Sequence, residues 1–179
     1  MADLRVKKVK DFSAELTVPG DKSISHRALM FAALSNGPCE ITGFLASEDC
    51  LATMNALTAM GVEIEQLGDN GTHIRVHGCR GEFTDPGKPI DCGNSGTTMR
   101  LLSGILASQP FETTLIGDES LSKRPMNRIA LPLEKMGARI KGQGDRCTAP
   151  LKITGRSKLS PIHYDSPVAS AQIKSAIML

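Results

Sequence analysis

The amino-acid sequence predicts an α/β (α+β) protein built from a repeated βαβαββ unit. The first observation behind this prediction is a helix start that occurs three times, each time as small or hydroxyl-bearing residues followed by a cation. The spacing between Arg27 and Arg100 equals, within one residue, the spacing between Arg100 and Lys174. Recurrence at a fixed period indicates internal repeats.

The second observation is that the landmarks downstream of the first helix start return in the same order. Leu, Met, Gly and Ile of residues 57–64 recur in residues 133–140, and the apolar-x-apolar-x-Gly pattern of residues 74–78 recurs in residues 151–155. We therefore expect an internal duplication, followed by a third copy that is cut short.

The first unit is expected to open with a strand at residues 15–18, where apolar and polar residues alternate. Pro19 and Gly20 end that strand, and a helix of good helix formers follows over residues 28–34. A short strand at residues 39–44 comes next.

The second helix of this unit is expected to begin after Ser47, which is a typical N-cap residue. Glu48 and Asp49 in the first turn complement the helix dipole. The helix is predicted to run to Met60, with Gly61 as its C-cap.

Two strands at residues 62–64 and 72–76, joined by a turn at residues 68–71, complete the order βαβαββ. The second copy is predicted over residues 90–155. The third copy is expected to open with a strand at residues 162–164 and to stop inside its first helix, so the chain resembles a piece of a longer protein.

The composition is that of an ordinary folded domain with an aliphatic core. Hydrophobic residues make up 40% of the 179 residues, aromatic residues only 3%, and the net charge is +2. Few aromatic residues and no basic run argue against a nucleic-acid partner. Six methionines are expected to fill the core: Met54, Met60, Met99, Met126, Met136 and Met178.

The five cysteines are scattered and form no C-x-x-C pair, which indicates reduced thiols and a cytoplasmic location. The first ten residues are too charged for a signal peptide or a membrane span, so no membrane association is predicted.

The repeated helix starts predict anion-binding sites. The first N–H groups of a helix lack intrahelical partners and carry the positive end of its dipole. Cations placed there, such as Lys22 and Arg27, strengthen the attraction for a phosphate or a carboxylate.

Several polar residues have two interpretations. His26 is more readily a partner at a helix start than a catalytic base. Arg100 either binds an anion or ties its helix to a neighbour, and Arg128 is expected to be a surface cation. His73 and His77 share one face of a strand, but nothing in the sequence supplies a third ligand, so no metal site is predicted.

Four motifs resemble those of the 5-enolpyruvylshikimate-3-phosphate synthase family. Residues 21–28 read DKSISHRA, residues 93–100 read GNSGTTMR, residues 120–126 read SLSKRPM, and residues 166–174 read SPVASAQIK. They occur in the family's order and near its spacing. The resemblance covers the chain from end to end but only about the first two-fifths of a typical family member.

The resemblance implies three βαβαββ units packed about a pseudo-threefold axis, with helices inside and sheets outside, which is the enolpyruvyl transferase fold or inverse α/β barrel. By analogy, residues 1–18 are a strand and hinge shared with a second domain. Residues 19–165 are then two repeat units, and residues 166–179 begin the truncated third unit.

The implied activity is transfer of the enolpyruvyl group from phosphoenolpyruvate to the 5-hydroxyl of shikimate 3-phosphate, with release of phosphate. The resemblance implies no metal, no organic cofactor and a monomeric full-length protein, and the isolated chain is expected to be inactive. Two alternatives stay open: a non-catalytic anion-binding fragment, and an enolpyruvyl transferase with another acceptor such as UDP-N-acetylglucosamine.

The resemblance also implies the role of each site residue. Lys22 would act in catalysis near the reacting atoms, and the shikimate carboxylate would be held by Ser23 and Arg27. The phosphoenolpyruvate pocket would be shaped by Asn94, Gly96 and Arg124. The shikimate phosphate would be surrounded by Ser170, Ala171 and Gln172, and Gln172 would also reach phosphoenolpyruvate. Many family members have serine where this chain has Ala171.

Overall fold

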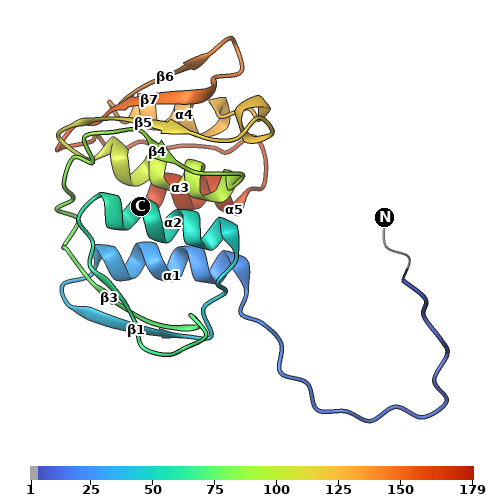
Figure 1. Ribbon diagram of the computed structural model, residues 1–179. Coiled ribbons are helices and arrows are strands. Elements are labelled where there is room, and N and C mark those ends of the chain that lie inside the picture. Colours follow the sequence, from blue (N-terminus) through green and yellow to red (C-terminus); the bar gives the residue numbers. More distant parts are fainter. Residues whose placement is uncertain (1–3) are drawn as a thin grey trace.

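The computed structural model describes residues 4–179. Figure 1 shows a layer of helices that lies between two sheets. The helices of this layer are α1 (Lys22–Leu34), α2 (Glu48–Ala59), α3 (Gly96–Ala107) and α5 (Ala171–Met178). The expected arrangement of helices inside and sheets outside is therefore confirmed.

The first sheet consists of β1 (Pro38–Thr42), β2 (Ile64–Gln66) and β3 (His73–His77), in the antiparallel order β1-β3-β2. Its inner face carries Ile74 and Val76, which are fully buried against the helices.

The second sheet has four strands, in the order β4-β5-β7-β6. Their bounds are β4 (Ile90–Asp91), β5 (Glu112–Ile116), β6 (Arg139–Gln143) and β7 (Thr148–Thr154). A short 3-10 helix, η1 (Leu121–Lys123), and helix α4 (Asn127–Lys135) lie between β5 and β6 in the chain.

The two sheets confirm the duplication. Strands β5, β7 and β6 of the second unit stand in the same order as β1, β3 and β2 of the first. The second unit adds β4, which pairs in parallel with β5, and so realises the full order βαβαββ. No described strand fills the corresponding place beside β1.

The predicted strand at residues 15–18 is not formed in this structure. Residues 4–20 contain no helix or strand, and they lead away from the body (Figure 1). Leu16 and Val18 are 75% and 77% exposed. A strand needs a neighbouring strand for its backbone hydrogen bonds. The alternation of apolar and polar residues at positions 15–18 does not provide such a partner.

The core is aliphatic, as the composition predicts, and it joins both units. Helix α3 contributes more buried apolar residues than any other described element, with Met99, Leu101, Leu102 and Ile105 fully buried. Helix α3 also packs closely on α5 at Gly104, where an added Cβ would overlap the backbone oxygen of Ala176.

Two expectations for the third unit are wrong. Residues 162–164 form no strand, because no described strand pairs with them. Met178, expected in the core, is 79% exposed at the end of α5. Ile173 and Ala176 occupy the buried side instead.

None of the helices within residues 4–179 combines the length and the apolar character that crossing a bilayer requires.

Candidate active site

Helices α1, α3 and α5 begin in the same way, each with a side chain that caps the first turn. Asp21 Oδ1 accepts a hydrogen bond from the Ile24 N–H at 2.7 Å. Ser95 Oγ does the same for Thr98 at 3.1 Å, and Ser170 Oγ for Ile173 at 3.3 Å. Each cap satisfies one N–H group and leaves others of the first turn available to an anion.

Arg27 joins the first and third of these helices. Its Nε and one terminal nitrogen donate to Ser175 Oγ at 3.1 and 2.9 Å, and the same terminal nitrogen reaches the Ala171 carbonyl at 3.4 Å. The other terminal nitrogen donates to the Ser23 carbonyl at 3.1 Å. The structure therefore brings Ser23, Arg27 and Ala171 together at one place.

Lys22 lies at the start of α1 and pairs with Asp49 in the first turn of α2. About half of the Lys22 side chain is exposed, with 51% of its surface accessible to solvent. Lys22 is thus a cation held at the surface by one carboxylate, in a position that an anionic ligand can reach.

Arg100 joins α3 to α5 and also lies in a pocket. It donates to Gln172 Oε1 at 3.2 Å, while Gln172 Nε2 donates to Thr97 Oγ1 at 3.0 Å. Burial lowers the pKa of Arg100, and the charges of Arg124 and Arg128 lower it further. The guanidinium group of Arg100 is therefore surrounded by more positive than negative charge from the protein.

The pocket beside Arg100 has a volume of about 190 Å³ and no carboxylate in its wall. Its lining consists of Arg100, Pro125, Arg128, Ser170, Gln172 and Ile173. Two arginines and a helix N-terminus without a compensating acid favour an anion as the occupant.

Arg124 and Asn94 form a second polar group at the start of α3. Arg124 donates to Asn94 Oδ1 at 2.7 Å and to Ser120 Oγ at 3.2 Å. Asn94 Nδ2 donates to Asp118 Oδ2 at 2.6 Å. The Leu121 N–H and Asn94 hold the pKa of Asp118 below its usual range, so this carboxylate stays charged and fixes the asparagine.

Gly96 lies between the two arginines. A Cβ at this position would come within 2.7 Å of a terminal nitrogen of Arg100 and 3.4 Å of one of Arg124. The absence of a side chain at Gly96 therefore leaves both guanidinium groups open towards the N-terminus of α3.

His26 lies beneath the helix starts and is fully buried. Its Nδ1 is 2.7 Å from Thr53 Oγ1, which is 2.7 Å from Thr98 Oγ1. Thr98 in turn donates to the capping oxygen of Ser95 at 2.7 Å. Burial lowers the pKa of His26 to about 4, so the ring is neutral and links α1, α2 and α3, as a partner at a helix start should.

Comparison with known proteins agrees with this geometry. The sequence model of the EPSP synthase (3-phosphoshikimate 1-carboxyvinyltransferase) family matches residues 6–179. The chain is 53% identical over 176 residues to the 3-phosphoshikimate 1-carboxyvinyltransferase of Brevibacillus brevis, and 56% identical over 165 residues to that of Lactococcus lactis. These matches cover 98% and 91% of this chain. The chain belongs to the EPSP synthase family.

A solved EPSP synthase structure from Acinetobacter baumannii superposes on this fold with a TM-score of 0.85 and 51% sequence identity, over 90% of this chain and 36% of that one. The chain spans 41% of the Brevibacillus brevis relative and 37% of the Lactococcus lactis relative. The family fold expected from the four motifs is therefore confirmed, and so is the expectation that they cover about two-fifths of a family member.

The predicted site residues of this EPSP synthase chain form two groups, with Gln172 between them. One contains Ser23, Arg27 and Ala171, and the other contains Asn94, Gly96 and Arg124. Lys22 contacts Asp49 and has no described bond to either group.

The sequence did not predict that Arg100 and Arg128 line the same pocket. Arg100 is both a tie between helices and part of the pocket wall, so its two interpretations are compatible. Arg128 is exposed, as expected, yet it lines the same pocket. Arg124 precedes α4 and has an extended backbone, so helical spacing could not have predicted that Arg128 lines the pocket.

Proposed function

We propose that this chain supplies the shikimate 3-phosphate site and part of the phosphoenolpyruvate pocket of a 3-phosphoshikimate 1-carboxyvinyltransferase. The observation that carries the proposal is the approach of Arg100 and Arg124 to Gly96, with Arg128 lining the pocket beside Arg100, at helix starts whose caps leave further N–H groups available. Both substrates carry a phosphate and a carboxylate, and this cluster is suited to such groups.

In the proposed reaction, the 5-hydroxyl of shikimate 3-phosphate gives up its proton and its oxygen bonds to C2 of phosphoenolpyruvate, while the C2–C3 double bond opens and C3 takes a proton. The bond from C2 to the phosphate oxygen then breaks, and loss of phosphate and of one C3 proton restores the double bond. Negative charge is present on both substrates throughout, so the cations of this chain hold them together against mutual repulsion.

The family resemblance supplies the proposed residue roles, and the contacts in the structure support them. Arg27 would exchange its bonds to Ser175 for a bidentate grip on the shikimate carboxylate, with Ser23 beside it. Ser170, Ala171 and Gln172 at the start of α5 would surround the shikimate phosphate. Each of these three either lies in the first turn or caps it.

The phosphoenolpyruvate side of the site would consist of Arg124, Asn94 and Gly96. Arg124 is held by Asn94, which Asp118 holds in turn, so the guanidinium is positioned before a ligand arrives. Lys22 would turn from Asp49 to the substrates near the reacting atoms, since its side chain is half exposed.

We also propose that the segment of residues 4–18 pairs outside the body described here, as the strand and hinge expected for residues 1–18. Its alternating apolar residues Leu16 and Val18 are exposed, and such residues are usually covered. Residues 1–3 of the expected segment lie outside the described residues.

The function is tested on the intact protein by measuring phosphate release from phosphoenolpyruvate with two acceptors, shikimate 3-phosphate and UDP-N-acetylglucosamine. We expect turnover with the first acceptor only. Turnover with the second would support the alternative transferase, and binding of shikimate 3-phosphate without any turnover would support the non-catalytic alternative.

Variants connect this assay to the site. Arg124→Gln should raise the KM for phosphoenolpyruvate by about tenfold or more, because one charge-assisted hydrogen bond is lost. The matched control is Arg139→Gln, an exposed arginine on β6 outside the site, which should leave KM unchanged. Equal effects of the two substitutions would remove Arg124 from the proposed pocket.

A further inference from the structure

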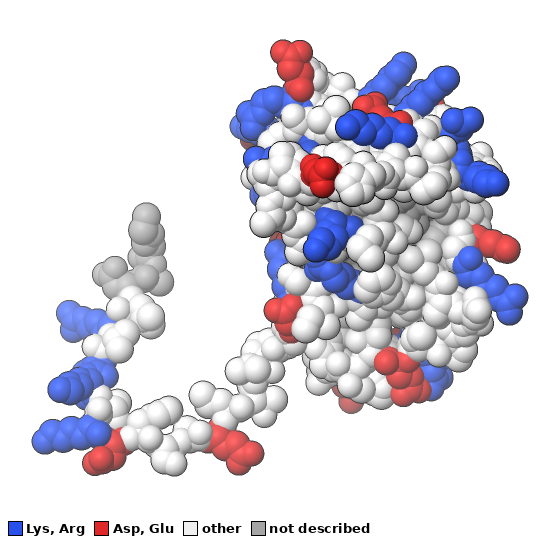
Figure 2. Space-filling model, turned by 180° about the vertical axis from the view of Figure 1, so that it is seen from behind, with Lys and Arg blue, Asp and Glu red and all other residues white. Residues whose placement is uncertain are grey.

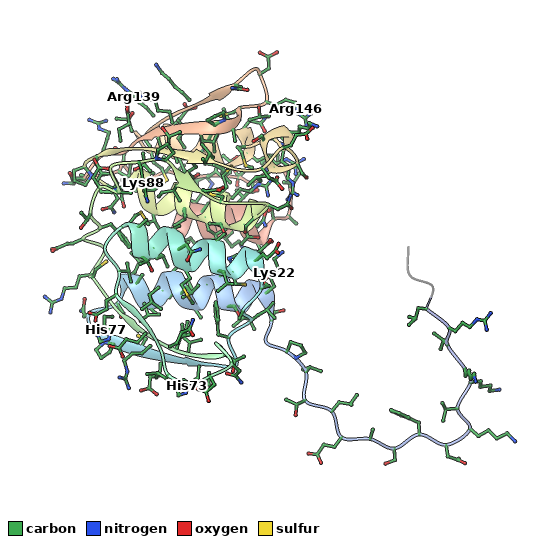
Figure 3. The ribbon with its side chains drawn as sticks, in the orientation of Figure 1. Lys22, His73, His77, Lys88, Arg139 and Arg146 are labelled. Atoms are coloured by element: carbon green, nitrogen blue, oxygen red, sulfur yellow. The ribbon has the colours of Figure 1, made fainter. Side chains whose placement is uncertain are left out.

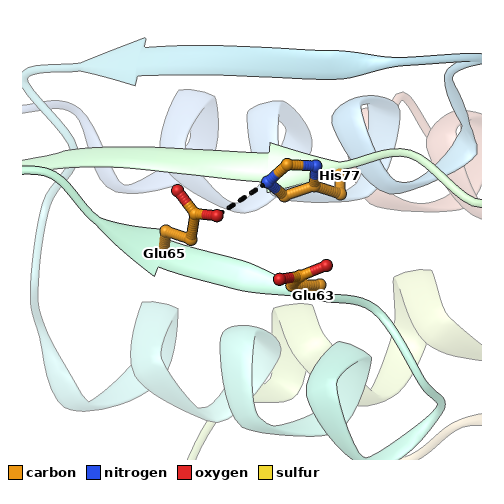
Figure 4. A group of neighbouring side chains, drawn as sticks. All are labelled: Glu63, Glu65 and His77. Carbon is orange, nitrogen blue, oxygen red and sulfur yellow. Dashed lines mark hydrogen bonds and ion pairs between the residues drawn. The ribbon is translucent and has the colours of Figure 1, made fainter.

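The outer face of the first sheet carries a group of side chains that the proposed reaction does not use. Glu63, Glu65 and His77 each place one potential ligand atom within 4.8 Å of the others (Figure 4). His77 lies on the outer sheet, whereas Lys22 lies at the starts of the helices (Figure 3). The group is therefore separate from the candidate active site.

Strand register explains why these three residues meet. The His77 N–H donates to the Glu63 carbonyl at 2.9 Å, so the two residues stand opposite each other at the end of the β2–β3 ladder. Glu65 lies two residues further along and on the same face, with its Oε1 3.1 Å from His77 Nε2. Neighbouring strands thus offer two carboxylates to one imidazole (Figure 4).

Arg75 orients the central carboxylate of this group. It donates to Glu65 Oε2 at 3.4 Å, while the other oxygen of Glu65 faces His77. A second bond, from Arg75 to Glu40 at 2.6 Å, fixes the arginine itself. An outer-shell cation that holds one oxygen of a carboxylate and leaves the other free is a common support for metal ligands.

We propose that Glu63, Glu65 and His77 bind a divalent transition-metal ion, with Zn²⁺ as the best-matched species. Zinc accepts imidazole nitrogen and carboxylate oxygen at about 2.0–2.2 Å, so two ligands at a tetrahedral angle lie about 3.3 Å apart. The distance of 3.1 Å between Glu65 Oε1 and His77 Nε2 needs only a small widening to accept the ion. Mg²⁺ and Ca²⁺ prefer all-oxygen sites and should bind far more weakly.

The three side chains leave some coordination positions of the ion open to water. The side chains of Glu65 and His77 are 41% and 37% exposed, so water completes the coordination. The expected effect is structural, because the ion would link β2 to β3 at the end of a short ladder. Two carboxylates also neutralise its double charge.

His73 provides a matched control on the same strand and face. Its Nε2 is 3.5 Å from Glu40 Oε2, and no third ligand completes that pair among the described residues. His73→Gln should therefore leave zinc binding unchanged, whereas His77→Gln should remove the only nitrogen ligand of the group.

The intact protein is titrated with zinc chloride, and calorimetry measures the binding. A thermal melt is recorded at each zinc concentration. We expect one site in the wild type whose affinity falls by about tenfold or more in His77→Gln and in Glu63→Gln, but not in His73→Gln. Zinc should raise the melting temperature of the wild type and of His73→Gln only. Equal zinc affinity in the wild type and His77→Gln would overturn the proposal, as would the absence of saturable binding.

Discussion

Arg27 on α1 reaches across to α5 and donates two hydrogen bonds to a single oxygen, Ser175 Oγ, at 3.1 and 2.9 Å. Arg27 lies in the first repeat unit, and α5, which carries Ser175, is proposed as the start of a third unit. Arg100 on α3 makes the corresponding link to α5 through Gln172. Arginines on α1 and α3 thus tie α5 in place, where anions are expected to bind. Figure 2 shows that Lys and Arg side chains are distributed over several parts of the displayed face, and that Asp and Glu side chains lie among them.

Replacement of Arg27 by Ala should weaken binding of shikimate 3-phosphate by about 2–4 kcal/mol, because the ligand's carboxylate loses its charged partner. Titration calorimetry on the intact protein measures this loss. Ser175→Ala is the control, since it removes the contact between the helices and keeps the cation. If Ser175→Ala weakened binding as much as Arg27→Ala, Arg27 would serve only as a tie between helices.

Gly96→Ala should raise resistance to glyphosate, with some loss of phosphoenolpyruvate affinity. The added methyl would come within 2.7 Å of Arg100 and displace its terminal nitrogen from the pocket. Resemblance to the family indicates that this methyl crowds glyphosate more than the smaller phosphoenolpyruvate. The measurement is the inhibition constant for glyphosate alongside the KM for phosphoenolpyruvate, and identical inhibition constants in the two proteins would refute the steric argument.

Gly104→Ala should destabilise the fold by about 3 kcal/mol, at the upper end of overpacking effects, because the new Cβ would overlap the backbone of α5 at Ala176. Gly37→Ala is the matched control: an added Cβ there meets no atom within 4 Å, and a change within about 0.5 kcal/mol is expected. Urea unfolding of both variants measures the difference, and equal stabilities would show that α3 and α5 do not pack as described.

Local signals in the sequence predicted the repeat and the start of the second helix well, but the helix expected over residues 28–34 begins six residues earlier, at Lys22. The second helix begins after Ser47 and ends at Ala59, two residues before Gly61, whose φ of +90° suits glycine. The Oγ of Ser47 nevertheless makes no capping bond. Spacing along the chain decides such features, because a helix start involves only residues within one turn.

Features that depend on distant partners were not predictable in the same way. The strand expected at residues 15–18 lacks a neighbour among the described strands. The sequence places His77 near His73, whereas the register of β2 and β3 brings it to Glu63 and Glu65. Alternation shows which residues share a face, but strand pairing decides which of them meet.

As the pH drops from about 6.5 to about 4, protonation of His26 should lower the stability of the protein. Burial lowers the pKa of His26 to about 4 in the folded state, while an unfolded histidine titrates near 6.5. Below pH 6.5 the unfolded state therefore binds the proton first, and folding loses up to about 3 kcal/mol by pH 4. Above pH 6.5 this residue contributes no pH dependence.

His26→Gln tests that prediction, because it removes the titrating group and keeps a polar side chain towards Thr53. Urea unfolding at several pH values should show a smaller decline of the free energy of unfolding in the variant than in the wild type. Parallel curves would mean that the ring of His26 can take up a proton in the folded state.

The isolated chain of residues 1–179 should release no phosphate from the two substrates. Proton transfer to C3 needs a group that can give up a proton at neutral pH. Of the carboxylates at the described site, Asp49 pairs with Lys22, and Asp118 has a lowered pKa and accepts bonds from Asn94 and Leu121. Asp118 is therefore not suited to act as the acid, and Asp49 is engaged by Lys22, so the reaction should require groups that these residues do not supply.

The apolar side chains of α5 and the following Leu179 are at least partly covered in this chain. Ile173 is only 3% exposed, and Ile177 and Leu179 are partly buried, so aggregation is not a necessary property of the isolated chain. Solubility is therefore a poor readout, and phosphate release is the better one.

We expect turnover to appear only when the chain is mixed with the complementary C-terminal part of the protein. Turnover by residues 1–179 alone would place the proton-transfer groups within them and would contradict the expectation that the rest of the protein supplies these groups.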